Sequence, residues 1–302
     1  MNYQSILYEK SRGIATITLN RPEKLNAMNQ GAHGIVREFV RAAGEAESDP
    51  EVRVVIVKGA GRCFCSGYDI SGEAATTGKH WEKTPLVERT SNDWMDLEMD
   101  TRQWWIDAIW NNPKPFIAQV HSFCLAGGMD LAATCDITIC SDDAVFGYPA
   151  VRYGSIPTTP VWAYLVGFKK AKEIVLTGNM YTAKEMHDFH LVNKVVPRDK
   201  LDEEVRTLAS EMTKMPEVGQ KINKMWVNEL FDIAGCRSAL AFTNALGGIV
   251  HTSRDAVGRE FFKIVVEKGL KAALEFRDAK FAEVDVAGRE LRQRRLDKTK
   301  QA

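Results

Sequence analysis

The pattern of apolar and polar positions predicts strands mainly in the first half of the chain and helices mainly in the second. Short apolar runs bounded by turn residues predict strands at residues 14–19, 53–58, 116–120, 137–140, 144–146 and 191–196. Apolar residues that recur every three or four positions predict helices at residues 29–48, 91–110, 199–213, 217–232, 237–250 and 254–281. Strand–helix units followed by helices indicate an α/β core with a helical C-terminal region.

A further helix is expected after the strand at residues 116–120, where Ala126-Gly127-Gly128 interrupts the apolar pattern. Good helix formers follow, so the helix is predicted to begin at the glycines. The first amides of a helix lack intrahelical acceptors, and the helix dipole places partial positive charge there. Asp130 lies within the first turn, so backbone donors and a carboxylate would meet, as carbonyl chemistry requires. A tight turn with a dipole-stabilising aspartate is the alternative interpretation.

Composition excludes several classes of function. Lys and Arg together number 40, as do Asp and Glu, so no net positive charge points to nucleic acid or a membrane surface. The N-terminus has no apolar signal core, and no apolar run reaches membrane-spanning length, so we expect a cytoplasmic protein. The six cysteines are expected to be reduced thiols. No metal is expected, because Cys63-x-Cys65 has the wrong spacing and no HxxxH or HExxH pattern occurs.

Three segments in the same order resemble the enoyl-CoA hydratase/isomerase (crotonase) family. They are LNRPEKLNAM at residues 19–28, GRCFCSGYDI at 61–70, and the stretch from Pro113-Lys114-Pro115 through Ala126-Gly127-Gly128 to Cys135-Asp136. Two shorter matches, LTG at residues 176–178 and LVNKVV at 191–196, support the resemblance. It implies an α/β spiral of repeated ββα units at residues 1–200. It also implies a C-terminal helical region with a basic tail at 201–302, which packs trimers or dimers of trimers.

The resemblance also implies a coenzyme A thioester as substrate and no separate cofactor. In the family two backbone amides hold the thioester oxygen, and by position these belong to Ser66 and Gly127, with Asp130 as the catalytic acid or base. Fixed amides stabilise the negative charge of an enolate without reorganising. The residues that the resemblance places along the CoA and acyl channel are Lys24, Leu25, Ala27, Arg62, Cys65, Ser66, Gly67, Tyr68, Asp69, Ile70, Gly127 and Ala150. Lys24 and Arg62 would meet CoA phosphates or remain solvated surface charges.

The sequence departs from the hydratases of the family at two places. Their second glutamate follows a Gly-x-Pro context, which reads Gly147-Tyr148-Pro149-Ala150 here, so the second acid is absent. Their glycine-rich stretch is replaced by Thr158-Thr159-Pro160, which predicts a reshaped acyl wall. Hydration needs both an acid and a base. Candidate substitutes for the missing acid are His80, Asp93, Asp96, Asp100, His121, Tyr148 and Tyr153.

Three functions therefore stay open. The first is a lyase or isomerase that forms an oxyanion-stabilised enolate from an acyl-CoA thioester. The second is a hydrolase of a CoA thioester or of a β-keto carbon–carbon bond, and Ala150 favours it. The third is a non-catalytic acyl-CoA binder or an RNA-associated family member, and zero net charge argues against RNA.

Overall fold

A unit of two strands and a helix recurs along the chain. The computed structural model describes residues 2–71, 83–85 and 88–285, although only some of the side chains within residues 91–106. The repeated units are β1 (Ile6–Ser11), β2 (Ile14–Leu19) and α1 (Ile35–Ser48); β4 (Phe116–Val120), β5 (Phe123–Leu125) and α4 (Gly127–Thr134); and β6 (Ile137–Ser141), β7 (Val145–Gly147) and α5 (Val161–Val166). Between the first two units lie β3 (Val54–Gly59), α3 (Ser91–Arg102) and a π-helical segment, Gln103–Trp110.

The strands form two sheets. The larger has the order β1-β2-β3-β4-β6-β9, in which only β1 and β2 are antiparallel, and it ends with β9 (Lys194–Val196). The smaller has the order β5-β7-β8 and includes β8 (Met180–Thr182). The second and third units therefore each give one strand to each sheet. This arrangement confirms the predicted spiral of ββα units.

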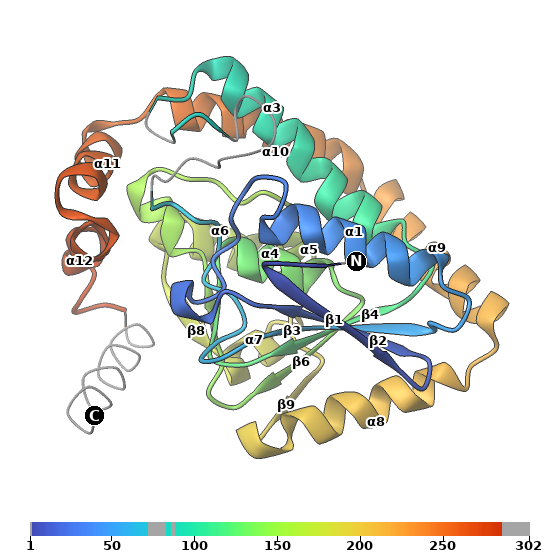
Figure 1. Cartoon of the computed structure of the whole chain (residues 1–302). Helices are drawn as coiled ribbons and strands as arrows, with labels where there is room; N and C mark the ends of the chain where they lie inside the picture. Colours follow the sequence, from blue (N-terminus) through green and yellow to red (C-terminus); the bar gives the residue numbers. More distant parts are fainter. Residues whose placement is uncertain (1, 72–82, 86–87, 286–302) are drawn as a thin grey trace.

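Two apolar layers cover the larger sheet. On one face α8 (Leu201–Thr213) buries Leu201, Val205 and Ala209 against Ile56 and Ile117 (Figure 1). The main core lies on the other face, where α1 and α4 pack against neighbouring positions of the same strands. Alternate residues of β3 point to opposite faces, so its continuous apolar run is explained by burial on both sides.

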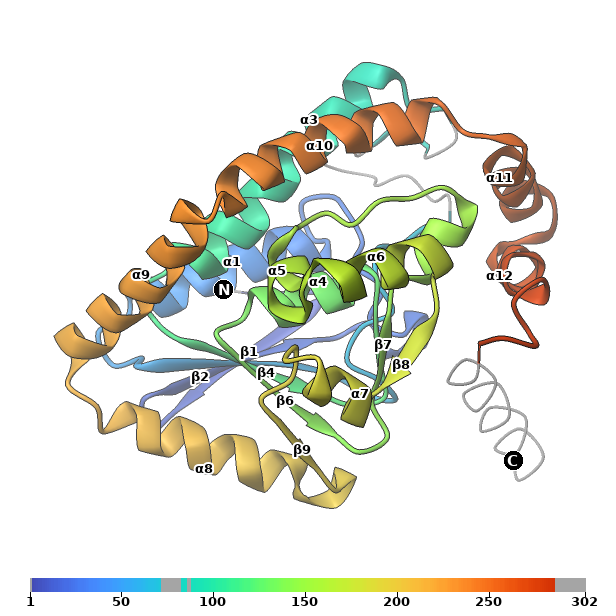
Figure 2. The same ribbon diagram turned by 180° about the vertical axis from the view of Figure 1, so that it is seen from behind.

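Two further helices, α6 (Phe168–Thr177) and α7 (Ala183–Asp188), precede β9. The helices after α8 form the C-terminal region: α9 (Glu217–Ile233), α10 (Cys236–Thr252), α11 (Ala256–Lys268) and α12 (Leu270–Ala279). In both views α10 runs beside α3, while α11 and α12 lie at one side of the core (Figures 1 and 2). In the described part of the chain no single helix is long and apolar enough to cross a bilayer, although the bent pair α9–α10 passes that test jointly.

Some predicted boundaries were wrong for local reasons. The helix expected at residues 29–48 begins only at Ile35, because Gly31 has a φ of +94° and the Asn29 side chain accepts the Ile35 amide. The helix expected at 254–281 is broken at Gly269, whose φ is +84°. The strand expected at 191–196 is only three residues long, and β1, β5 and β8 were not expected. β5 and β8 have three residues each, too few for a visible alternation, and β1 has six residues of which only Ile6 is buried, so its apolar pattern is weak.

Candidate active site

Three segments that are distant in sequence meet at the amino end of α4. Isolated parallel bridges join Met28 to Tyr68 and Cys65 to Cys124. The buried Asn26 side chain ties the first two segments together, because its amide nitrogen donates to the carbonyl oxygens of Ala60 at 2.8 Å and Cys63 at 2.9 Å. Contacts within the protein therefore hold together the segments around residues 26–28, 60–68 and 124, which carry the family-like motifs.

Glycine is required where α4 begins. A Cβ atom on Gly127 would lie 2.6 Å from Met28 Cε and 2.6 Å from a ring carbon of Tyr68. A Cβ atom on Gly128 would lie 2.7 Å from the carbonyl oxygen of Cys65. Real Cβ atoms do not come this close to other atoms, so a larger residue at Gly127 would displace the Met28 and Tyr68 side chains, and one at Gly128 would push the backbone segments apart. The prediction that the helix begins at the glycines is confirmed.

The two amides expected to hold an oxyanion lie on facing segments, and they differ in whether a hydrogen-bond acceptor already occupies them. The Gly127 N–H has no acceptor within the described part of the chain, as expected at the first position of a helix. The Ser66 N–H donates to the carbonyl oxygen of Leu25 at 3.1 Å. A ligand oxygen placed between the segments would have to share or replace this second bond.

Asp130 is fully buried one turn into α4, and four donors surround its carboxylate. Its Oδ2 accepts the Tyr148 hydroxyl at 3.0 Å, the Thr158 hydroxyl at 2.7 Å and the Thr158 amide at 3.2 Å. Its Oδ1 accepts the Trp162 indole N–H at 3.0 Å. Burial raises the pKa of Asp130 to about 7, although these four hydrogen bonds oppose the rise. All the donors are neutral, so the site holds a carboxyl group able to exchange a proton near neutral pH.

The elements around Asp130 explain this environment. Tyr148 precedes a 3₁₀ helix, Pro149–Tyr153, which contains the buried Ala150; Trp162 belongs to α5 and Thr158 to the intervening loop. Tyr148 was one of seven candidates for the missing acid, and the structure places its hydroxyl on Asp130. Sequence reasoning missed Thr158 and Trp162 as partners. The departure at Thr158-Thr159-Pro160 was the only signal for one of them.

Tyr68 forms the outer end of this network. Its hydroxyl lies 3.2 Å from Thr158 Oγ1, and its ring packs against Gly127. Tyr68 and Thr158 are partly exposed, whereas Asp130 is not exposed at all. The Thr158 hydroxyl therefore connects the buried carboxylate to Tyr68, whose ring contacts Gly127.

The other residues expected along the channel fall into two groups. Lys24 and Arg62 are exposed on loops that touch, since a Cβ atom on Gly61 would lie 2.7 Å from Pro22 Cβ. Leu25, Ala27 and Ile70 are partly exposed.

The second group is held within the protein. Asp69 pairs with Arg21 at 2.9 Å; burial raises its pKa, but hydrogen bonds from Ser71 and Arg21 outweigh burial and lower it. Cys65 is fully buried and its thiol donates to Asn26 O at 3.2 Å. Burial raises the pKa of this thiol to about 12. These two side chains therefore hold residues 65–69 against residues 21–26 by an ion pair and a hydrogen bond.

Most of the other candidate acids have structural partners elsewhere. Asp93 accepts the Thr90 amide at 2.8 Å at the start of α3, and Asp100 pairs with Arg37 at 2.7 Å. Tyr153 stacks on Phe261 with ring centres 4.4 Å apart. Asp96 is exposed, and His80 lies outside the described residues.

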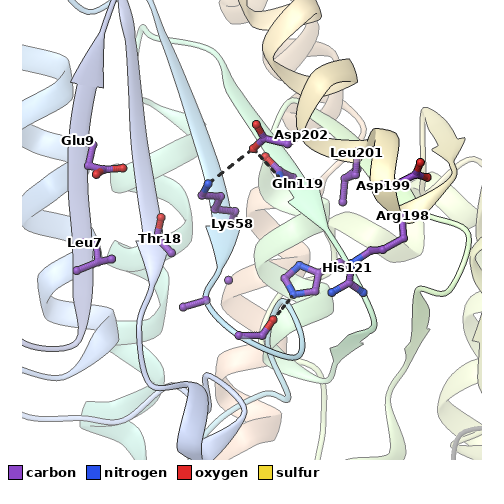
Figure 3. A pocket seen from close by; sticks show the side chains of 13 residues that line it. Leu7, Glu9, Thr18, Lys58, Gln119, His121, Arg198, Asp199, Leu201 and Asp202 are labelled. Carbon is purple, nitrogen blue, oxygen red and sulfur yellow. Dashed lines mark hydrogen bonds and ion pairs between the residues drawn. The ribbon is translucent and has the colours of Figure 1, made fainter. Parts of the chain in front are cut away.

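His121 faces a surface pocket of about 420 Å³ on the α8 side of the larger sheet (Figure 3). Its Nε2 lies 3.1 Å from the carbonyl oxygen of Gly61, which fixes the ring at the pocket edge. Burial, and then the nearby Arg198 guanidinium, lower the pKa of His121 to about 4. The imidazole is therefore neutral at physiological pH, and Asp130 and its partners do not line this pocket.

Comparison with known proteins identifies the family of the chain. A family model described as enoyl-CoA hydratase/isomerase matches residues 9–282. A probable enoyl-CoA hydratase of Mycobacterium tuberculosis is 31% identical over 239 residues, which cover 77% of this chain and 84% of the relative. A probable mitochondrial enoyl-CoA hydratase of Dictyostelium discoideum is 33% identical over 232 residues, covering 74% and 76%.

A solved structure shares the fold along nearly its whole length. The crystal structure of an enoyl-CoA hydratase/isomerase from Xanthobacter autotrophicus Py2 has a TM-score of 0.84 and 33% identity, covering 92% of this chain and 99% of that one. An enoyl-CoA hydratase from Mycobacterium smegmatis has a TM-score of 0.82 at 26% identity, covering 92% and 94%. The chain therefore belongs to the enoyl-CoA hydratase/isomerase family.

Proposed function

We propose that the protein forms an enolate from an acyl-CoA thioester, with the amides of Gly127 and Ser66 on the thioester oxygen and Asp130 as the final acceptor of the abstracted proton. The observation that carries the proposal is the buried Asp130 carboxylate beside the Gly127 amide. An enolate develops negative charge on the thioester oxygen, and a fixed amide at a helix start stabilises that charge. The substrate supplies the coenzyme A, and the proposal needs no other cofactor.

Ordinary hydration of a short enoyl-CoA is expected to be weak. The position of the family's second glutamate is Ala150, a buried methyl group that cannot hold or move a proton. Losing one positioned acid or base lowers a rate by about 10²–10⁴-fold. The absence of the second acid supports isomerisation, which moves a single proton. It also leaves hydrolysis of a thioester or of a β-keto carbon–carbon bond as the second candidate.

A panel of thioesters tests the proposal. Crotonyl-CoA, 3-enoyl-CoA and β-ketoacyl-CoA substrates are incubated with the protein. The products are separated by reversed-phase chromatography, because isomers have equal mass, and the other products are identified by mass. Isomerised product supports the first candidate, and free acid or cleaved carbon chains support the second. Binding of every thioester without turnover would contradict both. The Asp130→Asn variant is expected to lose turnover, while Ala150→Glu is expected to raise crotonyl-CoA hydration.

The assembly is part of the same proposal. The C-terminal helices carry an exposed apolar face, described below, which supports the expected homotrimer or hexamer.

A further inference from the structure

The pocket of about 420 Å³ beside His121 lies at the carboxyl ends of the parallel strands β2, β3 and β4 (Figure 3). Ligands of open α/β sheets bind at this end of the strands, and the volume is typical of a small-molecule site. Asp130, Ser66 and Gly127 do not line the pocket, so it is separate from the site of the proposed function. Its own lining indicates which class of ligand it fits.

The floor of the pocket is a row of polar side chains on neighbouring strands. Thr18 pairs with Lys58, and Lys58 pairs with Gln119, in the register of the parallel sheet. Two positions earlier on their strands, Ile56 and Ile117 belong to the apolar layer under α8. Thr18 and Gln119 are nevertheless buried. Because buried polar groups are stable only with hydrogen-bond partners, this row needs partners that an apolar row would not.

His121 adds a buried acceptor to the pocket. Its side chain is 7% exposed, and its Nε2 lies 3.1 Å from Gly61 O, which can only accept, so Nε2 carries the ring proton. Nδ1 of the neutral ring is then an acceptor, and no residue of the described chain donates to it. Lys58 Nζ lies 3.7 Å from Asp202 Oδ1, which is beyond hydrogen-bonding distance. The pocket therefore offers an acceptor and an ammonium group that are both available to a ligand.

Charges of both signs surround this acceptor. Burial is the main cause of the low pKa of His121, and the charges of Arg198 and Lys58 lower that pKa further, so both cations lie near the imidazole. The carboxylates of Glu9 and Asp199 also line the pocket, and both residues are exposed. A ligand of a single charge would meet groups of like charge, whereas a ligand that carries both charges complements the whole lining.

We propose that this pocket binds a small zwitterion of the amino acid class, a molecule with one carboxylate and one ammonium group. The ligand carboxylate is held by Lys58 and by the guanidinium of Arg198, of which only Nη1 is engaged, with Asp143 at 2.8 Å. The ligand ammonium group donates to His121 Nδ1 and faces the carboxylate of Asp199. The proposal goes beyond the proposed function and does not depend on it, because no residue of the thioester site takes part.

Ligand-observed NMR on the full chain tests the proposal, because it detects weak binding of small molecules. L-alanine, L-serine and β-alanine are the zwitterionic probes, whereas propanoate and ethylammonium each carry only one of the two charges. Loss of a hydrogen bond to a charged group weakens binding by about tenfold or more. Propanoate, ethylammonium and lactate, which has a hydroxyl in place of the ammonium group, should therefore bind at least that much more weakly than L-alanine.

Two variants assign the charges to named groups. Lys58→Met removes the ammonium group but keeps an unbranched side chain, and it should weaken binding of both L-alanine and propanoate by about tenfold. Asp199→Asn should weaken L-alanine by about two- to fivefold, because Asp199 is exposed, and should not weaken propanoate.

A matched control comes from the same short helix, Arg198–Lys200. Lys200 pairs with Glu203 at 3.3 Å and does not line the pocket. Lys200→Met removes one lysine charge close to the site and should bind L-alanine as the wild type does.

The outcomes separate this site from the thioester site. Zwitterion binding that persists in excess coenzyme A and is weakened by Lys58→Met supports the proposal. Propanoate that binds as tightly as L-alanine would make the pocket a general anion site and overturn the proposal. It is equally overturned if no zwitterion binds, if coenzyme A displaces the zwitterion, or if Lys58→Met leaves binding unchanged. Absence of thioester turnover would contradict the proposed function and leave this result intact.

Discussion

At the scale of single residues, the two amides of the proposed oxyanion site differ in their present hydrogen bonding. Its N–H is engaged with Leu25 O, whereas the Gly127 N–H has no acceptor in the described chain. A ligand oxygen must therefore compete with the Leu25 carbonyl oxygen for the Ser66 amide, whereas it can accept a hydrogen bond from the Gly127 amide without displacing another acceptor. The side chain of Ser66 plays no part in this arrangement, which makes the backbone role testable.

Ser66→Ala is expected to leave thioester binding and turnover nearly unchanged, since the amide is retained. Ser66→Pro removes the N–H and should raise the barrier by about 3 kcal/mol, the cost of one oxyanion donor. Steady-state kinetics on an active thioester measures both variants, and circular dichroism confirms that they fold. A folded Ser66→Pro protein with full activity would show that the donor lies elsewhere.

The pH dependence of α-proton exchange should follow Asp130. Burial raises its pKa to about 7, so the carboxylate is protonated below that pH and able to accept a proton above it. The titratable group that contacts it directly is Tyr148, whose pKa burial raises well above its usual value, so Tyr148 stays neutral over this range. The exchange rate, followed by NMR in D₂O on an acyl-CoA thioester, should therefore rise as pH increases through about 7 and then level off.

Two variants check this assignment by pH profile. Tyr148→Phe removes one donor to the carboxylate and should move the inflection to higher pH, because hydrogen bonds favour the charged form. Asp130→Asn should abolish the inflection together with the rate. An unchanged inflection in an active Asp130→Asn protein would assign the titration to another group.

The raised pKa of Asp130 also makes the free energy of unfolding depend on pH, because the folded and unfolded chains bind this proton with different affinity. The folded pKa of Asp130 lies above the value of about 3.9 for an unfolded aspartate. The folded protein therefore holds a proton that the unfolded chain has lost between about pH 4 and pH 7. This contribution to stability is complete below about pH 4 and is lost as pH rises through 7.

The residues of the site differ in how far the sequence could predict them. The glycines and Asp130 lie within one continuous stretch, so local pattern and motif spacing were sufficient. The partners of Asp130 lie 18, 28 and 32 positions away, and their contacts depend on how the loop before α5 folds back. No local pattern marks Trp162 as a donor to a carboxylate. Its role follows only from tertiary packing.

At the scale of elements, capping and turn residues determine where the helices begin and end, whereas apolar periodicity predicts only that they exist. Thr90 caps the start of α3, where its Oγ1 accepts the Asp93 amide while the Asp93 side chain accepts the Thr90 amide. Gly31 and Gly269 adopt positive φ values and end or delay helices whose apolar spacing continues past them. Periodicity therefore predicted the existence of these helices, and the glycines set their ends.

Gly44 gives an element-scale prediction because it lies inside α1 with open space around it. A Cβ atom added there would meet nothing within 4 Å. Alanine is favoured over glycine within a helix by about 0.5–1 kcal/mol, so Gly44→Ala should raise the free energy of unfolding by that amount. Gly34→Ala is the contrast, since its Cβ would lie 2.4 Å from Asn29 O and should destabilise the protein. Denaturant titration that ranked the two variants the other way would contradict this account.

The C-terminal segment is attached to the core by charge as well as by packing. The buried Arg152 donates to Asp285 at 2.8 Å and pairs with Asp278 at 3.4 Å. Its guanidinium also lies 4.0 Å from the ring centre of Phe281. Because Arg152 belongs to the 3₁₀ helix that follows Tyr148, the same short element supports both the Asp130 network and the end of α12.

At the scale of the whole molecule, α9 is attached to the body by polar side chains and turns apolar ones outward. Lys224 donates to Ile109 O and pairs with Asp136 at 2.8 Å, and Asn228 donates to Trp110 O at 2.9 Å. The helix has no buried residue. Its exposed apolar residues are Val218, Ile222, Met225, Trp226, Val227, Leu230 and Ile233.

Such a face is expected to be buried by further copies of the chain. Contiguous apolar surface of this kind marks an interaction site in soluble proteins. Homo-oligomers with closed symmetry are the commonest soluble assemblies, and the family resemblance implies trimers or dimers of trimers. We therefore expect particles of about three or six times the chain mass of 33.8 kDa.

Charge placed on this face should break the assembly. Trp226 is 62% exposed and Ile222 is 56% exposed, so Ile222→Lys/Trp226→Lys removes little packing within the protomer. Lysines facing the same lysines across a symmetric contact would be desolvated and repel each other, so the double variant should sediment as a folded monomer. Leu7→Lys, on β1 and 46% exposed, introduces one lysine in place of an exposed apolar residue away from α9 and should keep the wild-type mass. A wild-type protein that sediments as a stable monomer at micromolar concentration would refute the assembly, and an unchanged oligomer of the double variant would move the interface away from α9.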